Sequence, residues 1–318
     1  MIAIIMATYN GEKYLREQLD SLLGQTVKDW VLHVCDDGSS DGTLKIVKEY
    51  IEAHAGKIYL HQNEQNLRSA WYFLAGLCQV PGESLADYYF FCDQDDRWDA
   101  DKLEVSLAEM KRLEEQFGTN NPLLVYTDSR MTDADGNVLA ESFQEASHYR
   151  KGQLDLAHLL MENRLPGCTE CFNASLADKV VQGMKGEGEL RFPEFMKMHD
   201  WWIALVAAAF GRIGYVNRAT MDYRQHGGNV VGGSGFLSYL KNRLAALDKQ
   251  KEAVKADVQQ GTCFYQWYGS ELKPKKRRVL EAFCSLEEAG FLRARYILFH
   301  YGFWKSGLVR NIALLLLI

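Results

Sequence analysis

Short apolar runs alternate with helical patterns through the first hundred residues. Four apolar runs have the length of buried strands: 1–7, 30–35, 57–61 and 87–92. Three stretches between them carry apolar residues at the three- and four-residue spacing of a helix: 13–23, 43–53 and 69–78. This alternation predicts an α/β fold with a mostly parallel, Rossmann-like sheet and helices on both faces.

Polar segments follow three of these strands at the point where each strand ends. They are Thr8–Gly11, Asp36–Gly42 and Asp93–Asp96. The carboxyl ends of parallel strands meet at one edge of a sheet, and ligands bind there. We therefore expect one pocket that is lined by all three segments.

The rest of the chain predicts a helical extension. A further strand is expected at 123–126, and helical spacing returns at 236–260 and in two stretches within 279–304. We therefore expect an α/β domain over residues 1–232 and a helical C-terminal extension over residues 233–318.

Composition and cysteine usage favour a soluble cytoplasmic protein. The chain has 318 residues, of which 47% are hydrophobic and 25% charged, and these fractions are not those of disordered or fibrous chains. The apolar start is too short for a signal peptide and lacks its basic flank. The seven cysteines are odd in number and scattered, as reduced thiols are. Cys168 and Cys171 have the spacing of a zinc or redox pair, but no second pair or close histidine follows them.

Positive charge is concentrated in the expected extension. From Ser234 onward there are 14 Lys/Arg against 7 Asp/Glu, whereas the whole chain has a net charge of −6. Lys273–Arg278 is basic, aromatic residues are frequent between 264 and 304, and the apolar end 312–318 is far shorter than the ~20 residues that span a bilayer. These features favour a peripheral contact with an anionic membrane surface. Solvated helices or a homodimer contact are the alternatives, and nucleic acid is not an expected partner.

Three carboxylates, Asp93, Asp95 and Asp96, crowd the end of the strand at 87–92. Neighbouring carboxylates repel one another unless a cation neutralises them, and hard divalent ions prefer oxygen ligands. The alternative is a solvated acidic turn. The two other polar segments at the same edge favour a metal-assisted nucleotide pocket.

The motifs resemble a known enzyme family when they are taken in order. Ala7–Gly11, Asp36–Thr43 and Asp93–Trp98 look like the successive motifs of glycosyltransferase family 2, whose catalytic domain has the GT-A fold. His199–Trp202 and Tyr223–Asn229 resemble later motifs of its rhamnosyltransferase-like branch. The loop that contains Cys168 is similar to the acceptor-side loop of that branch. The resemblance covers roughly residues 2–231.

The resemblance implies a donor site and a metal site. The residues implied to bind the nucleotide-sugar are Thr8, Tyr9, Asn10, Glu12, Asp37, Asp93 and Gln94. Asp95, with Asp93 and His226, is implied to hold Mg²⁺ or Mn²⁺ at the diphosphate. One departure concerns the turn at Asn66–Arg68, where the family usually has Asn-x-Gly. Arg68 is a further candidate for contact with the base or phosphates.

Asp200 is implied to be the general base. Transfer with inversion needs a deprotonated acceptor hydroxyl opposite the leaving group, and a base there contributes typically 10²–10⁴-fold. The resemblance implies that Cys168 lies on the acceptor side. Trp201 and Trp202 are expected there as well, because aromatic walls exclude water and pack on sugar faces. From the local sequence alone, Asp200 could equally be a dipole partner at the start of an apolar helix.

The expected function is metal-dependent, inverting transfer from a nucleoside-diphosphate sugar, first dTDP-L-rhamnose, to a saccharide or lipid-linked acceptor. The setting is surface polysaccharide synthesis at the inner face of the plasma membrane. A UDP-hexose donor is the alternative. A sugar nucleotidyltransferase is disfavoured because the segment after the first strand is not a Gly-rich basic loop. A non-catalytic sugar-nucleotide-binding protein is disfavoured because Asp95 and Asp200 are present. Gln94–Trp98 spells the Gln-x-x-Arg-Trp signature of processive synthases only by coincidence, since it overlaps the acidic motif.

Overall fold

The computed structural model describes residues 1–62, 69–80, 86–149, 154–186, 189–225 and 247–318. Its strands are β1 (Ile2–Thr8), β2 (Trp30–Asp36), β3 (Ile58–Gln62), β4 (Tyr88–Asp93), β5 (Arg97–Trp98), β6 (Leu123–Thr132), β7 (Val138–Ala140), β8 (Glu170–Asn173) and β9 (Arg212–Arg224). Its α-helices are α1 (Leu15–Leu23), α2 (Thr43–Ala53), α3 (Ser69–Gln79), α4 (Lys102–Phe117), α5 (Phe143–Ala146), α6 (Leu156–Met161), α7 (Ala174–Met184), α8 (His199–Phe210), α10 (Leu247–Tyr268), α11 (Pro274–Cys284), α12 (Phe291–Tyr301) and α13 (Leu308–Leu317). Two 3₁₀ turns complete the list, η2 (Gly167–Thr169) and η3 (Gly269–Glu271).

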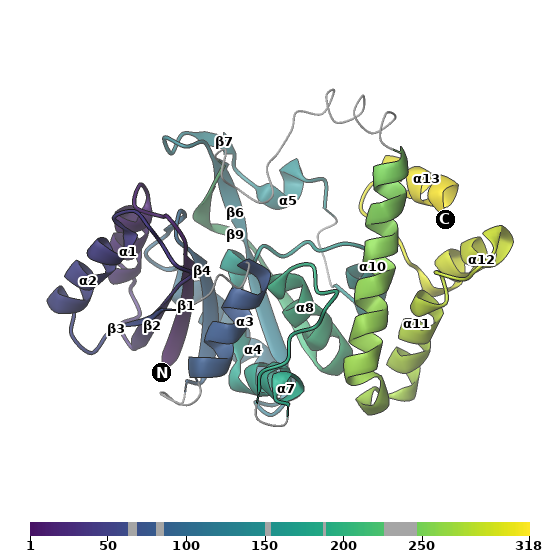
Figure 1. Cartoon of the computed structure of the whole chain (residues 1–318), viewed down its shortest axis with the longest axis horizontal. Helices are drawn as coiled ribbons and strands as arrows, with labels where there is room; N and C mark the ends of the chain where they lie inside the picture. Colours follow the sequence, from purple (N-terminus) through teal and green to yellow (C-terminus); the bar gives the residue numbers. More distant parts are fainter. Residues whose placement is uncertain (63–68, 81–85, 150–153, 187–188, 226–246) are drawn as a thin grey trace. The chain divides into compact units, whose positions relative to one another are not determined.

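One twisted sheet carries the first compact unit. Its strand order is β3-β2-β1-β4-β8-β6-β9-β5, with β7 paired to β6. Strands β3, β2, β1 and β4 are parallel, as the alternation of apolar runs and helices predicts (Figure 1). The sequence does not reveal β8, a four-residue strand that lies antiparallel between β4 and β6.

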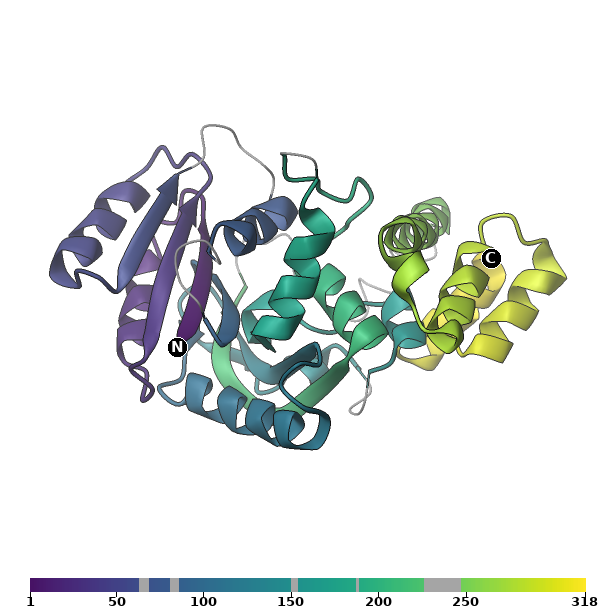
Figure 2. The same ribbon diagram turned by 90° about the horizontal axis from the view of Figure 1, so that it is seen from below.

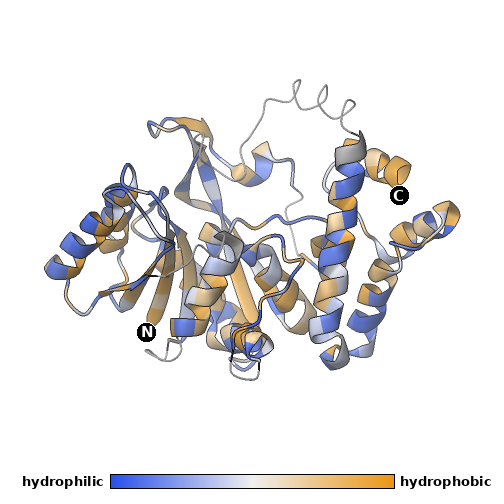
Figure 3. Cartoon of the chain, in the orientation of Figure 1, coloured by the Kyte–Doolittle hydropathy of each residue, from blue (hydrophilic) through white to orange (hydrophobic). Residues whose placement is uncertain are grey.

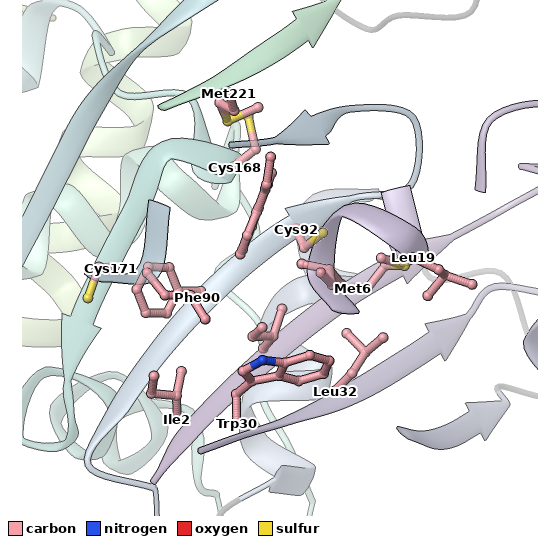
Figure 4. Close-up of a cluster of buried hydrophobic side chains, with 14 of the residues drawn as sticks. Ile2, Met6, Leu19, Trp30, Leu32, Phe90, Cys92, Cys168, Cys171 and Met221 are labelled. Atoms are coloured by element: carbon pink, nitrogen blue, oxygen red, sulfur yellow. The ribbon is translucent and has the colours of Figure 1, made fainter. Parts of the chain in front are cut away.

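Helices cover both faces of this sheet, which confirms the expected fold class. The apolar sides of α1, α2 and α4 pack on one face, against residues such as Ile2, Leu32 and Phe90 (Figure 4). Helices α3, α7 and α8 lie on the other face. Helix α8 is apolar all round, and all its residues except Phe210 are buried.

A second compact unit is built mainly from helices. It comprises 144–164, 193–197 and 225–318, so it takes two earlier segments as well as the C-terminal part (Figure 2). The expected boundary at residues 232 and 233 lies outside the described residues. Helix α10 packs against α6, α11 and α13 within this unit.

Buried carboxylates join the segments of the helical unit. Asp257, only 2% exposed, accepts from Lys197 at 2.6 Å and from Lys305 at 3.0 Å. Glu162 pairs with Arg310 at 2.6 Å. Breaking an ion pair of this kind is strongly destabilising, because it leaves a charge without its partner. The pairs therefore hold the separate segments together.

No helix among the described residues is long and apolar enough to cross a bilayer. All seven cysteines are free thiols, in agreement with the reduced state expected from their number and spacing.

Candidate active site

The ends of β2, β1 and β4 bring the three polar segments together. Thr8 lies opposite Asp36 on β2, and its neighbour Ala7 lies opposite Asp93 on β4. The Thr8 hydroxyl donates to Asp36 Oδ2 at 2.9 Å, and the Asp37 backbone N–H donates to the Thr8 carbonyl at 2.9 Å. The three polar segments therefore meet at one edge of the sheet, where both Asp36 and Asp37 are buried.

The loop after β1 is fastened to the loop after β2. Asn10 adopts a left-handed backbone conformation, with φ of 48°, and its Oδ1 accepts from the Ser40 N–H at 2.8 Å. Glu12 Oε2 accepts from the Gly42 N–H at 2.8 Å, where Gly42 precedes the first residue of α2. Both side chains were expected at the nucleotide. In the structure their hydrogen bonds hold the two loops in register.

Gln94 joins the acidic motif to the loop after β1. Its side-chain amide accepts from the Tyr9 N–H and donates to the Tyr9 carbonyl, each at 3.0 Å. This two-bond clamp fixes the backbone of Tyr9, whose side chain is 52% exposed. An exposed aromatic ring on a fixed backbone is a suitable stacking surface for a nucleobase.

The acidic cluster contains carboxylates with raised pKa values. Burial, followed by the charges of Asp95 and Asp200, raises the pKa of Asp93 to about 7. Burial and the charges of Asp95 and Asp93 raise the pKa of Asp96 well above its ordinary value. Asp200 therefore lies close enough to the acidic cluster to interact with it, although it is more than a hundred residues away in the sequence.

The acidic cluster fits a hard divalent cation. Ligand atoms of Asp93, Asp96 and Cys168 all lie within 4.8 Å of one another. Asp96 is 1% exposed, and its Oδ2 has no hydrogen-bond partner among the described residues. Unpaired carboxylate oxygens in a crowded acidic site suit Mg²⁺ or Mn²⁺, whereas a thiol whose pKa burial raises is a poor ligand for them. Asp95, the expected principal ligand, is half-buried and is not one of these three clustered residues.

Two buried cations, Arg224 and Lys102, flank the acidic cluster. Arg224, 4% exposed, donates from its backbone N–H to Asp96 at 3.1 Å and from Nε to the Asp95 carbonyl at 2.8 Å. It also pairs with Glu17 at 2.5 Å. Lys102 is fully buried, with its Nζ 4.9 Å from the centroid of the Trp98 ring, and burial lowers the pKa of Lys102 to about 8.

Asp200 is oriented by two backbone donors. Its Oδ2 accepts from the Gly167 N–H at 3.1 Å and its Oδ1 from the Trp201 N–H at 2.5 Å. Asp200 is the second residue of α8 and is 6% exposed. Its position therefore satisfies both interpretations of the sequence, a carboxylate at a helix N-terminus and a fixed base close to the acidic cluster.

His199 forms a rigid wall behind Asp200. Its ring stacks on Phe73 with centroids 4.0 Å apart and meets Phe91 edge-on at 5.0 Å. Burial lowers the pKa of His199 to about 3, so the ring is neutral at ordinary pH. A Cβ atom placed on Gly167 would lie 2.6 Å from His199 Nε2, so only glycine fits this position.

Two further ionisable groups face this region: Glu170, for which the local sequence gave no signal, and Tyr223, which begins the motif Tyr223–Asn229 but was given no role of its own. Glu170 is fully buried, and neither of its carboxylate oxygens has a hydrogen-bond partner among the described residues. Burial and the charge of Asp200 raise the pKa of Glu170 well above its ordinary value. Burial and nearby carboxylates, including Asp93 and Asp200, raise the pKa of Tyr223, which keeps its hydroxyl protonated.

The remaining expected residues differ in their accessibility. Trp202 is fully buried, and its indole packs inside the protein. Trp201 is 6% exposed, and Cys168 is fully buried beside Asp96. Arg68 and His226 lie outside the described residues.

Part of the chain matches a family model and several relatives. Residues 3–121 match the model described as Glycosyl transferase family 2. EpsE of Bacillus subtilis, a glycosyltransferase by name, is 34% identical over 127 residues, which cover 40% of this chain and 44% of EpsE. The dTDP-rhamnosyl transferase RfbG of Shigella flexneri is 27% identical over 71% of this chain and 73% of RfbG. Residues 3–121 of the chain are therefore similar to glycosyltransferase family 2.

One more relative has an informative name. The UDP-Glc:alpha-D-GlcNAc-diphosphoundecaprenol beta-1,3-glucosyltransferase WfgD of Escherichia coli is 33% identical over 41% of this chain and 48% of WfgD. This chain thus aligns with less than half the length of EpsE and of WfgD.

Solved structures share the fold. TarS 1–349 of S. aureus in complex with UDP aligns over 95% of this chain and 91% of TarS, with a TM-score of 0.53 and 16% identity. The mannosyltransferase PcManGT of Pyrobaculum calidifontis, in complex with GDP-Man and Mn²⁺, aligns over 98% of this chain and 78% of that chain, with a TM-score of 0.52 and 16% identity. These similarities confirm the GT-A fold.

Proposed function

We propose that this protein is a metal-dependent, inverting glycosyltransferase that uses a nucleoside-diphosphate sugar. The observation that carries the proposal is the convergence of Asp37, Asp93 and Asp200 on one edge of a GT-A sheet, in a chain whose residues 3–121 match glycosyltransferase family 2. Its relatives named for sugar transfer support the same class of reaction.

The nucleotide binds between the loops after β1 and β2. Tyr9 stacks on the base, Thr8 and Asp37 line the base and ribose, and Asp93 approaches the ribose. Asn10, Glu12 and Gln94 act indirectly, since their hydrogen bonds hold the loops that form the pocket. Arg68 and His226 remain candidates for contact with the diphosphate.

Asp93, Asp95 and Asp96 would hold Mg²⁺ or Mn²⁺. When bound, the cation stabilises the negative charge of the departing diphosphate. Burial and then the repulsion between carboxylates raise the pKa values of Asp93 and Asp96, and a bound cation would offset both effects. The Mn²⁺ named in the PcManGT complex supports this choice of ion.

Asp200 removes the proton from the acceptor hydroxyl. The N–H groups of Gly167 and Trp201 fix its carboxylate, and His199 keeps the wall behind it rigid. Trp201 and the loop at Cys168 border the acceptor side. The donor proposed first is dTDP-L-rhamnose, which the name of RfbG supports, with a UDP-hexose as the alternative. The acceptor is a saccharide, lipid-linked as in the name of WfgD, at the cytoplasmic face of the membrane.

A panel of donors tests this proposal. The full chain is mixed with dTDP-L-rhamnose, UDP-glucose, UDP-GlcNAc or GDP-mannose, with Mn²⁺ or with EDTA, and its melting temperature and the release of nucleoside diphosphate are recorded. One donor is expected to stabilise the chain in the presence of Mn²⁺ and to be slowly hydrolysed, because a ligand that binds only the folded state raises its stability. Pyrophosphate release from a nucleoside triphosphate and a sugar phosphate would favour a nucleotidyltransferase. No stabilisation by any donor would contradict the proposal.

A further inference from the structure

The last two helices of the chain expose an unusual amount of apolar surface. Of the fourteen large hydrophobic side chains that are exposed among the described residues, eight lie between 291 and 318. They are Phe291, Leu292, Tyr296 and Phe299 on α12, and Leu308, Val309, Ile312 and Leu316 on α13. Figure 3 shows these two helices largely in the hydrophobic colour. Exposed apolar residues gathered in this way mark an interaction surface.

Helix α12 is apolar on two opposite faces. Ala294, Ile297 and Leu298 point into the helical unit and are buried. Leu292, Tyr296 and Phe299 follow one another at four- and three-residue spacing, so they form a stripe on the exposed side. The buried face packs into the core of the helical unit, whereas packing within the unit does not account for the exposed apolar stripe.

Basic residues border this stripe. At 100° per residue, Arg293 and His300 lie along one side of it and Arg295 along the other. Arg295 also donates to the carbonyl groups of Leu315 and Ile318, which holds α12 and α13 together. An apolar stripe between basic side chains has the pattern of a helix that lies in the interface of an anionic membrane.

Charge along the segment favours a membrane over a second copy of the chain. Residues 291–318 contain four Lys/Arg and no Asp/Glu, and Lys273–Arg278 on the neighbouring α11 adds five more basic residues. Two copies meeting through this surface would bring like charges together. Anionic lipid headgroups would attract Arg293, Arg295 and the basic residues of 273–278, whereas Lys305 and Arg310 pair with Asp257 and Glu162 inside the helical unit.

The sequence placed this contact partly on the wrong residues. Phe264, Tyr268 and Phe303, which lie among the aromatic residues between 264 and 304, are buried in the helical unit. Their side chains support the unit from inside, and the exposed side chains of α12 and α13 form the surface.

We propose that the exposed stripe of α12, together with the exposed apolar residues of α13, binds the surface of an anionic bilayer. The helices lie in the interface, with leucine and aromatic side chains among the acyl chains and the arginines at the headgroups. This surface deepens the proposed function, because it would hold the enzyme where a lipid-linked acceptor is found. Its binding does not depend on the identity of the donor.

Co-sedimentation of the full chain with vesicles tests the proposal. Vesicles of equal parts phosphatidylglycerol and phosphatidylcholine are compared with phosphatidylcholine alone, at low and high salt. The double variant Leu292→Ser/Phe299→Ser is expected to bind the anionic vesicles at least tenfold more weakly, because each buried apolar side chain contributes about tenfold to partitioning. Arg293→Glu is expected to weaken binding more than about fivefold and to reduce its salt dependence.

Val138→Ser/Leu139→Ser is the matched control, since these two residues are 49% and 61% exposed on β7 of the other unit. Its vesicle binding is expected to be unchanged. Donor-induced stabilisation is measured in parallel and is expected to persist in every variant, so failure of this surface and failure of the proposed function are distinguishable. Absence of vesicle binding by the unmodified chain would overturn the proposal. So would a concentration-dependent dimer that Leu292→Ser/Phe299→Ser dissociates.

Discussion

Replacement of Gly167 by alanine tests how tightly the base is positioned. The added Cβ would lie 2.6 Å from His199 Nε2 and 3.3 Å from Asp200 Cβ, whereas ordinary contact begins at 3.4 Å. His199 cannot turn away, because Phe73 stacks on it at 4.0 Å and Phe91 meets it at 5.0 Å. The loop and the start of α8 must therefore separate by about 0.8 Å, the difference between 2.6 and 3.4 Å.

The separation has a calculable consequence for Asp200. The bond from the Gly167 N–H to Asp200 Oδ2 is 3.1 Å, and the same separation would lengthen it beyond the range of a hydrogen bond. A misplacement of about 1 Å can lower a rate about 10²-fold. Overpacking of this kind costs about 1–3 kcal/mol of stability. We therefore expect Gly167→Ala to fold with reduced stability and to lose about 10²-fold in kcat.

The assay is release of nucleoside diphosphate from the donor that the panel identifies. The KM for the donor is expected to stay within about threefold, since the donor-binding loops are not touched. Gly24→Ala is the matched control, because its Cβ would meet only two backbone oxygens at 3.4 Å, the lower limit of ordinary contact. Full kcat in a folded Gly167→Ala protein would refute the positioning argument.

Three further predictions concern the charged groups around the acidic cluster. Glu170→Gln should flatten the pH dependence of stability. The folded chain keeps a proton on Glu170 above the ordinary pKa of 4.5, whereas the unfolded chain loses it. The Glu170 carboxyl group therefore lowers the free energy of unfolding by about 1.4 kcal/mol per pH unit until the raised pKa is reached. Urea unfolding at pH 5, 6 and 7 measures this, and identical pH slopes in the two proteins would contradict it. Asp96→Asn should raise the melting temperature in EDTA, because it removes one of the repelling carboxylates. The same variant should no longer be stabilised by Mn²⁺. An undiminished stabilisation by Mn²⁺ would exclude Asp96 as a ligand. Arg224→Gln should lower the free energy of unfolding by about 2–3 kcal/mol, since it removes the contacts of a buried guanidinium with Glu17 and the Asp95 carbonyl. Chemical denaturation measures this, and unchanged stability would show that these contacts contribute little.

The sequence predicted those parts of the fold that depend on local pattern. The parallel strands β1 to β4 and the loops at their ends were located within one or two residues, because apolar runs and turn residues mark them directly. Strand β8 was missed, since four residues between a 3₁₀ turn and a helix carry too short a pattern to separate from either neighbour.

The candidate site was predictable in its motifs and not in its contacts. Asp93 and Asp200 were nominated from motif order, and the structure brings them together. The clamp of Arg224 on Glu17 joins residues 207 positions apart, and nothing in the local sequence of either residue indicates it. Likewise, Glu12 was expected at the ribose, but its partner at Gly42 lies in a loop whose path only the folded chain defines.

The central claim is that Asp200 performs the chemistry on a donor that other residues bind. Its most direct test is Asp200→Asn, with the donor dissociation constant and the turnover measured on the same protein. The account predicts donor binding within about threefold of the unmodified chain and turnover lowered by about 10²–10⁴-fold, the contribution of a general base. Unchanged turnover would contradict the account, and loss of donor binding with the fold intact would place Asp200 in the donor site instead.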